Sequence, residues 1–266
     1  MSRASYRYKA RRRAVKHLQS LFEDSTPVEV IHYSCESFYD RPDGSTPRVT
    51  SIAVHNPSAS QTRSFSIHKI AEQHQIPSDQ ITERYDELEK KMLDEFYQFV
   101  EHRLASKWAN WNMRDINFGF PAIEHRYKVL GGNPVEVPPS SQYDLGELLP
   151  RVYGCNYCEH PRLQSLVELN QITSLGFLTG EEEAAAFDNC EYVKLHQSTL
   201  RKVQCIATIA ERAWDGTLET NSSWLERHGS SIAGVVEGMT NHWAYKVLGA
   251  IGILVSLFLA FSKLWT

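Results

Sequence analysis

Cysteine is scarce in this chain, with five in 266 residues. An odd and sparse set of thiols provides no disulfide framework and suits a reducing compartment. The chain also has no glycine-rich phosphate loop, no dinucleotide fingerprint and no nucleophile elbow, which excludes several common enzyme classes. Acidic and basic residues nearly balance, giving a net charge of -4. A global electrostatic field that recruits nucleic acid is therefore absent.

The N-terminal residues lack the apolar stretch of a secretory signal peptide. They carry seven lysines and arginines before the first acid, Glu23, a bias that favours the cytoplasmic side of a membrane. Three interpretations of this basic segment, residues 1–26, stay open. It is a solvated helix face, a contact for anionic lipid headgroups, or a contact for a phosphate backbone.

Charge is absent again from Val247 to Ser262. A helix that is apolar on every side does not suit the surface of a soluble domain. These residues span roughly 24 Å, and their amphipathic flanks extend them towards the ~30 Å hydrocarbon core. The side chains suited to the two interfaces are Trp243, Lys246, Lys263 and Trp265.

We therefore predict a single-pass tail anchor over residues 246–265, after a connector over 215–245, with the preceding domain in the cytoplasm. The alternative is a buried C-terminal helix of a soluble core. Lipid bilayer is then a partner of the chain. Small residues at Gly249, Gly252 and Ser256 would permit helix contact within a homo-oligomer.

Hydrophobic periodicity predicts a mixed sheet covered by helices, an α/β fold, over residues 27–214. Alternation of β-branched and aromatic residues indicates strands over 27–36, 49–54, 63–67 and 107–111. Apolar residues three and four apart predict an amphipathic helix over 84–104. Further helices are expected over 116–130, from an N-cap at Asp144, and over 160–171, 181–188 and 195–214.

Four segments stand at the ends of these elements, in a fixed order. They are Ser34-Cys35-Glu36, the run Trp111-Asn112-Met113-Arg114-Asp115-Ile116-Asn117-Phe118-Gly119-Phe120, Tyr143-Asp144-Leu145, and the stretch from His196 to Arg201. In that order they resemble the motifs of the DnaQ-like 3′–5′ exonucleases of the ribonuclease H-like superfamily. The resemblance covers residues 27–214 and implies a ribonuclease H-like mixed sheet flanked by helices.

The resemblance also implies a metal site that this sequence alters. Acids of the family hold two Mg²⁺ or Mn²⁺ ions about 3.5–4 Å apart. Here Ser34 stands for the first acid and Arg201 for the last, while Glu36 and Asp115 remain as weak ligands. If the domain is active, the resemblance makes Glu36, Asp115 and His196 catalytic. The positive charge of the Arg201 guanidinium repels dications. We therefore expect that the domain has lost the two metals and holds no cofactor.

The altered pocket leaves several interpretations open. Arg201 could pair with Glu36 in place of the metals, the interpretation we favour. Alternatively Arg114, Arg201 and Lys202, with His196, could bind a phosphate. A third possibility is that Asp40, Asp188 and Glu191 act as displaced ligands. The pair Cys155 and Cys158 with His160 has too few companions for structural zinc, so ordinary thiols are expected.

Three functions follow from these features. The favoured hypothesis is a membrane-anchored, catalytically degenerate exonuclease-like domain that binds nucleic acid or another protein subunit. The second is an active metal-dependent nuclease held at the membrane. The third is a membrane effector whose soluble domain senses a partner or ligand and assembles its transmembrane helices. Fold analogy alone does not choose among them.

Overall fold

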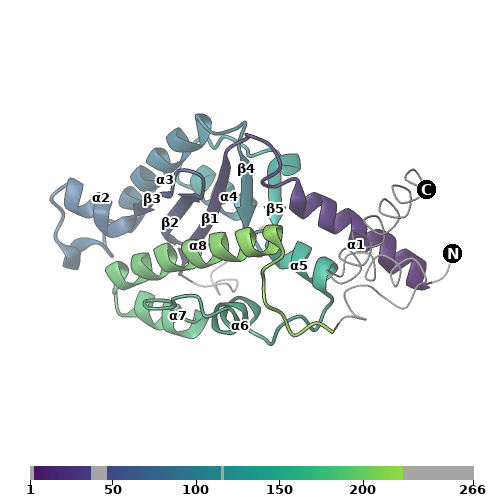
Figure 1. Cartoon of the computed structure of the whole chain (residues 1–266). Coiled ribbons are helices and arrows are strands. Elements are labelled where there is room, and N and C mark those ends of the chain that lie inside the picture. The colour runs from purple at the N-terminus through teal and green to yellow at the C-terminus, as the bar shows by residue number, and fades with distance from the viewer. Residues whose placement is uncertain (1–2, 37–46, 115–116, 224–266) are drawn as a thin grey trace, which may run out of the picture.

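A five-stranded mixed sheet forms the centre of the computed structural model, which describes residues 3–36, 47–114 and 117–223. The strand order is β3-β2-β1-β4-β5, visible in Figure 1. The strands are β1 (Val28–Cys35), β2 (Val49–Asn56), β3 (Gln61–Ser66), β4 (Lys107–Asn110) and β5 (Gln142–Asp144). β1, β2 and β3 pair antiparallel, whereas β4 runs parallel to β1 and β5 parallel to β4.

The central strand β1 is buried along its whole length. Successive side chains of a strand point to opposite faces. Ile31, Tyr33 and Cys35 accordingly join one hydrophobic core, and Val28 and Val30 join the other. His32 and Ser34 share the alternation of Val28 and Val30, so the sequence places two polar side chains on the second face.

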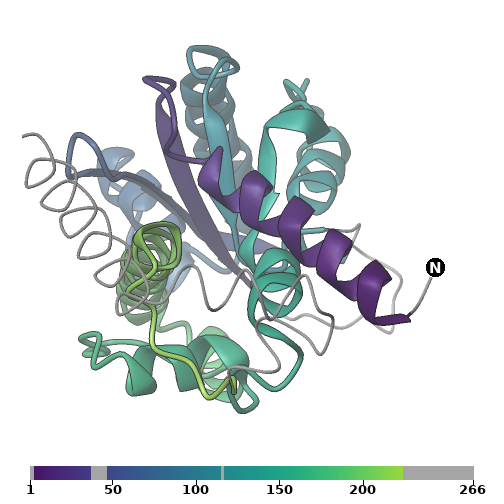
Figure 2. The same cartoon turned by 45° about the vertical axis from the view of Figure 1, so that its right-hand side comes forward.

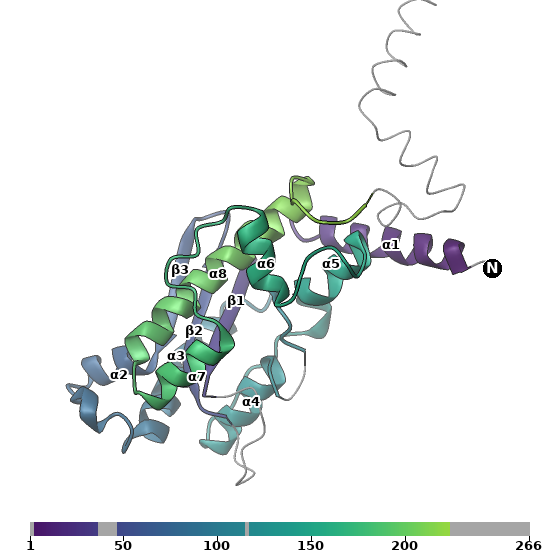
Figure 3. The same cartoon turned by 90° about the horizontal axis from the view of Figure 1, so that it is seen from below.

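Helices cover both faces of the sheet. The first core contains side chains of α2 (Ile67–Gln73), α3 (Tyr85–Glu101) and α4 (Phe120–Val129). The second contains side chains of α1 (Arg3–Gln19), α5 (Leu145–Tyr153), α6 (Arg162–Leu169) and α8 (Tyr192–Asp215). Seen from below, α8 crosses the sheet with α6 and α7 (Gly180–Asp188) beside it (Figure 3). Two short 3-10 turns lie at Ser78–Gln80 and Pro139–Ser141.

The N-terminal helix α1 packs onto the domain rather than standing apart from it (Figure 2). Ala14, Leu18 and Leu21 recur at helical spacing and are buried in the second core. Arg11 Nε donates to the Val152 carbonyl of α5 at 3.0 Å. The second half of residues 1–26 therefore belongs to the domain core, while exposed basic side chains occupy the other faces of the helix.

Between β1 and α8, the predicted strands β1 to β4 and helices α3 to α8 are confirmed, whereas the sequence pattern does not predict the helix α2. Three details differ. Ile67 begins α2 instead of ending β3, the three-residue β5 was not predicted, and Pro150 lies inside α5. Asp144 is the expected N-cap, because its side chain accepts from Gly146 N. A short strand such as β5 offers too few residues for alternation to be recognised.

Within the described ranges, no helix is both long and apolar enough to cross a membrane. The predicted anchor over 246–265 lies outside those ranges. So do its interfacial residues Trp243, Lys246, Lys263 and Trp265.

Candidate functional site

A buried polar cluster occupies the end of β1 beneath α8. Ser34 Oγ lies 2.8 Å from Thr199 Oγ1 of α8 and donates to Glu183 Oε1 of α7 at 3.1 Å. Thr199 Oγ1 is also 2.7 Å from Ser51 Oγ of β2. Glu183 is only 2 % exposed, and the three hydroxyl-bearing residues are fully buried. This cluster contains Ser34, the position that the family's first acid would take.

Lys202 supplies the positive charge of the cluster. Its Nζ lies 2.8 Å from Glu183 Oε1, and both side chains are almost entirely buried. Ser198 Oγ donates to the same carboxylate oxygen at 2.8 Å. A buried ion pair needs such additional hydrogen bonds, because desolvation of both charges opposes its formation. The cluster is thus a self-satisfied ionic and hydrogen-bonded unit.

Local sequence explains how these groups meet. Ser198, Thr199 and Lys202 are spaced by one, three and four residues, so they share one face of α8. Glu183 is placed by the capping box of α7, in which Thr179 and Glu182 satisfy each other's backbone amides. The two helices then lie against each other with the carboxylate between α8 and β1.

Two buried histidines lie near this face. Burial, and then the charge of Lys202, holds the pKa of His32 well below its ordinary value. Both ring nitrogens of His32 are buried without a hydrogen-bond partner. Burial, followed by the charges of Lys69 and His68, lowers the pKa of His196 to about 3. Both rings are therefore neutral at pH 7.

His196 lies towards α2 rather than at the end of β1. Its ring centroid is 5.0 Å from that of His68. A general base must reach the group that it deprotonates, whereas His196 faces a histidine and Lys69. The predicted catalytic role of His196 has no supporting contact among these neighbours.

Glu36 lies across from β2. Its backbone amide donates to the Arg48 carbonyl at 2.8 Å, and its carboxylate accepts weakly from Arg48 N at 3.4 Å. Its predicted companion Asp115 lies outside the described residues, as does Asp40. Asp188 and Glu191, considered as displaced ligands, flank the end of α7 and the start of α8 and are exposed.

The expected ion pair between Arg201 and Glu36 is not formed. Arg201 Nε donates to the Leu175 carbonyl at 2.9 Å, and Nη1 donates to Gln204 Oε1 at 3.1 Å. The physical reason is helical phase. Position 202, not 201, follows Ser198 and Thr199 on the face that meets the sheet. The cation that pairs with a buried carboxylate is therefore Lys202, which contacts Glu183, and not Arg201.

Among the side chains that the structure describes, which exclude Asp40 and Asp115, the donor set does not fit the two-metal site that the resemblance implies. Paired dications need several carboxylate oxygens. Across the described residues, no group of three or more histidine, cysteine or acidic side chains is placed to hold a metal ion. Ser34 offers a hydroxyl instead of a carboxylate. The neighbouring carboxylate of Glu183 is already paired with the ammonium group of Lys202 at 2.8 Å.

Arg114 belongs to a separate cluster after β4, so it does not converge with Arg201 and Lys202. Its Nε lies 2.7 Å from Asp144 Oδ2. Asp144 Oδ1 accepts from the backbone amides of Asn112 and Gly146, each at 2.9 Å. Burial raises the pKa of Asp144, although these amides and Arg114 act in the opposite direction. The cluster joins the ends of β4 and β5.

We expect Gly146→Ala to lower the free energy of unfolding by about 1–3 kcal/mol, the usual cost of overpacking. An added Cβ would lie 2.1 Å from Asn112 Oδ1, so the cluster around Asp144 would have to shift. Chemical denaturation of the two proteins measures the difference. Equal stability would contradict this tight packing. Gly131→Ala is a control for backbone strain alone, since φ is +77° there and nothing lies within 4 Å.

The cysteine pair shows no metal-site geometry. Cys155 is exposed and Cys158 is buried, and both are free. Cys158 Sγ donates to the Arg162 carbonyl at 3.7 Å. No zinc-ligand group is found near them in the described ranges.

Sequence reasoning missed Glu183, Ser198 and Thr199. The hydroxyls were recognisable, because they share a helix face with Leu195 and Lys202 in an otherwise apolar stripe. Glu183 gave no such signal. It is one of three consecutive glutamates at the start of α7, a position that is usually explained by the helix dipole.

The fold defines the class: a mixed α/β domain with a five-stranded sheet flanked by helices. No protein-family model matches the chain, and no curated protein matches it. Among solved structures, the chain is similar to the family B DNA polymerase from the hyperthermophilic archaeon Pyrobaculum calidifontis, with a TM-score of 0.53 and 14% identity. The match covers 81% of this chain and 27% of the polymerase chain. This likeness concerns the fold alone.

Proposed function

We propose that this protein is a catalytically inactive ribonuclease H-like domain that binds single-stranded nucleic acid and is held at a membrane by residues 246–265. The observation that carries the loss of catalysis is the ion pair between Lys202 and Glu183 beside Ser34. The ammonium group of Lys202 balances the charge of the Glu183 carboxylate, as a metal ion would. Unlike a metal ion, it offers no open coordination positions. The finer likeness to DnaQ-like exonucleases rests on the sequence motifs.

Two features support nucleic acid as the ligand. The fold is similar to that of a part, 27% of the chain, of a family B DNA polymerase, which is an argument from analogy. Independently, α1 exposes the basic side chains Lys9, Arg12, Arg13 and Lys16 on a helix that is firmly packed against α5. Clustered basic residues on one rigid element are the electrostatic footprint of phosphate-backbone binding.

The test uses the full chain, purified in detergent micelles, with end-labelled single-stranded DNA and RNA in the presence of Mn²⁺ or Mg²⁺. We expect strands to be retained by the protein and to stay uncut. Glu36→Ala is the control, and it should bind and preserve strands as the original protein does. Metal-dependent cleavage that disappears in Glu36→Ala would contradict the proposed loss of catalysis. Absence of any strand binding would contradict the nucleic-acid role.

A further inference from the structure

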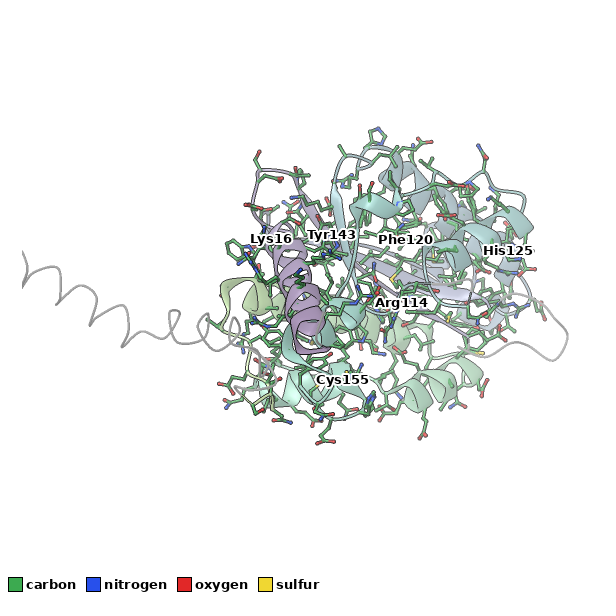
Figure 4. The ribbon with its side chains drawn as sticks, turned by 90° about the vertical axis from the view of Figure 1, so that its right-hand side faces the viewer. Lys16, Arg114, Phe120, His125, Tyr143 and Cys155 are labelled. Carbon is green, nitrogen blue, oxygen red and sulfur yellow. The ribbon has the colours of Figure 1, made fainter. Side chains whose placement is uncertain are left out.

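A cleft of about 270 Å³ lies between α1, α5 and the ends of β4 and β5. Its lining includes His17 of α1, Asn110 at the end of β4, Gln142 of β5 and Arg151 of α5. Figure 4 looks onto this side of the molecule and labels Lys16, Arg114 and Tyr143 there. In α/β sheets, ligands bind beyond the carboxyl ends of parallel strands. The cleft lies at that edge and is separate from the cluster around Glu183.

One polar group in the cleft lacks a partner. Asn110 is 1 % exposed, and its Oδ1 accepts from Met113 N at 3.2 Å. Its Nδ2 is buried and makes no hydrogen bond. A buried amide without a partner costs free energy, so a ligand with a hydrogen-bond acceptor at this point would be stabilised.

The charges of the cleft favour a neutral ligand. Two arginines, Arg114 and Arg151, are balanced by two carboxylates, Asp144 and Glu147. Arg114 pairs with Asp144 and Arg151 with Glu147. A phosphate group inside the cleft would meet both carboxylates, which repel it. The volume is below the roughly 300–1,000 Å³ of drug-sized sites, so it suits one small polar ring.

The ring of His17 lines one side of the cleft, and the buried side chain of Tyr143 supports it. The His17 ring stacks on Tyr143 with centroids 4.4 Å apart and an interplanar angle of 16°. Tyr143 OH lies 3.3 Å from Ser20 Oγ, which ties the ring to the end of α1. Planar side chains of this kind are the usual platforms for the bases of single strands.

The basic side chains of α1 continue from this platform. Arg13 lies one turn before His17, on the same face of α1, and Lys16 directly precedes His17 in the sequence. Each is exposed. An anionic lipid surface would meet such cations on a convex helix, but it would leave the neutral cleft and its unpaired amide unexplained. A strand with alternating bases and phosphates matches both features.

We infer that this cleft takes a single nucleobase of a bound strand, while the strand's phosphates lie along the exposed basic side chains of α1. This inference rests on the proposed function and specifies its contact surface. The base would place a ring or carbonyl acceptor against Asn110 Nδ2. The phosphates would lie outside the cleft, away from Asp144 and Glu147.

The test compares two oligonucleotides with the same phosphates, one normal and one abasic, by fluorescence anisotropy with the full chain in detergent. The original protein should prefer the normal strand by about tenfold. Asn110→Asp keeps an acceptor for Met113 N but replaces the free donor with a carboxylate. It should lose the preference, and its unfolding temperature verifies that the fold is retained.

The double variant Arg13→Glu with Lys16→Glu should weaken the binding of both strands equally. It should also reduce the slope of log affinity against log salt concentration by about 1 for each side chain. Lys194→Glu, an exposed change at the start of α8, is the matched control and should leave both affinities unchanged.

Three outcomes would overturn the inference. The first is an unchanged strand preference in Asn110→Asp, and the second is equal affinity of the original protein for both strands. The third is that the α1 double variant loses binding to phosphatidylserine vesicles but keeps its affinity for oligonucleotides, which would assign α1 to a lipid surface. Failure of the original protein to bind any oligonucleotide would instead refute the proposed function itself.

Discussion

Replacing Lys202 with methionine is expected to lower the free energy of unfolding by about 3–5 kcal/mol. The substitution keeps the apolar stem but removes the ammonium group that lies 2.8 Å from Glu183. Glu183 would remain as a buried carboxylate with only hydroxyl donors, Ser34 and Ser198, to stabilise its charge. Chemical denaturation followed by tryptophan fluorescence measures the effect.

The matched control is Lys194→Met on the same helix. Lys194 pairs with Glu191 at 3.0 Å, but the two side chains are 51% and 44% exposed. A solvated pair of this kind contributes about 0–1 kcal/mol. The double variant Lys202→Met with Glu183→Leu should regain much of the lost stability, because no buried charge is left. If Lys202→Met were no worse than Lys194→Met, the buried pair would not be structural.

Acidification should destabilise the domain through His32 and His196. Each has a folded-state pKa below the unfolded value of about 6.5, so the unfolded chain binds protons that the folded chain does not. Their contribution is fully present above the unfolded pKa and is lost as pH falls below it. Between pH 6.5 and 5, the ring of His196 should remove about 2 kcal/mol, and His32 acts in the same direction.

The measurement is the denaturation midpoint as a function of pH for the original protein and for histidine variants. His196→Gln and His32→Leu should each reduce the loss on acidification. His74→Gln, at an exposed position after α2, is the control for removing a histidine from the surface. Carboxyls whose pKa is raised by folding, such as Glu29 and Glu89, stabilise the folded state as pH falls. The difference in midpoint between each variant and the original protein is therefore what isolates the histidines. If the plots of denaturation midpoint against pH were parallel for His196→Gln, His32→Leu and the original protein, the two histidines would not cause the loss of stability in acid.

The sequence predicts the architecture well because its periodic signals are strong. The buried strand around Ile31, the amphipathic helix around Met92 and the N-cap at Asp144 each follow from side-chain spacing or capping chemistry. β5 is missed because three residues carry no periodicity. The sequence pattern does not predict that α1 packs into the core, because its many charged residues obscure the apolar positions Ala14, Leu18 and Leu21.

The site is predicted less well, since it depends on helical phase and on long-range pairing. The sequence predicts a cation on α8 at Arg201, but a shift of one residue separates the half-buried Arg201 from the buried Lys202. Glu183 comes from a different helix, and no local pattern in sequence links it to Ser34, 149 positions earlier. The unpaired amide of Asn110 at the end of β4 cannot be predicted, because its burial depends on segments that are distant in sequence.

If the Lys202–Glu183 pair replaces a metal site, as we propose, the protein should not bind Mn²⁺ at this position. Electron paramagnetic resonance of Mn²⁺, titrated with the full chain in detergent, counts bound ions without requiring activity. We expect no stoichiometric binding at millimolar Mn²⁺ and the same spectrum for Glu36→Ala. Binding of one or two ions per chain that Glu36→Ala abolishes would contradict this proposal.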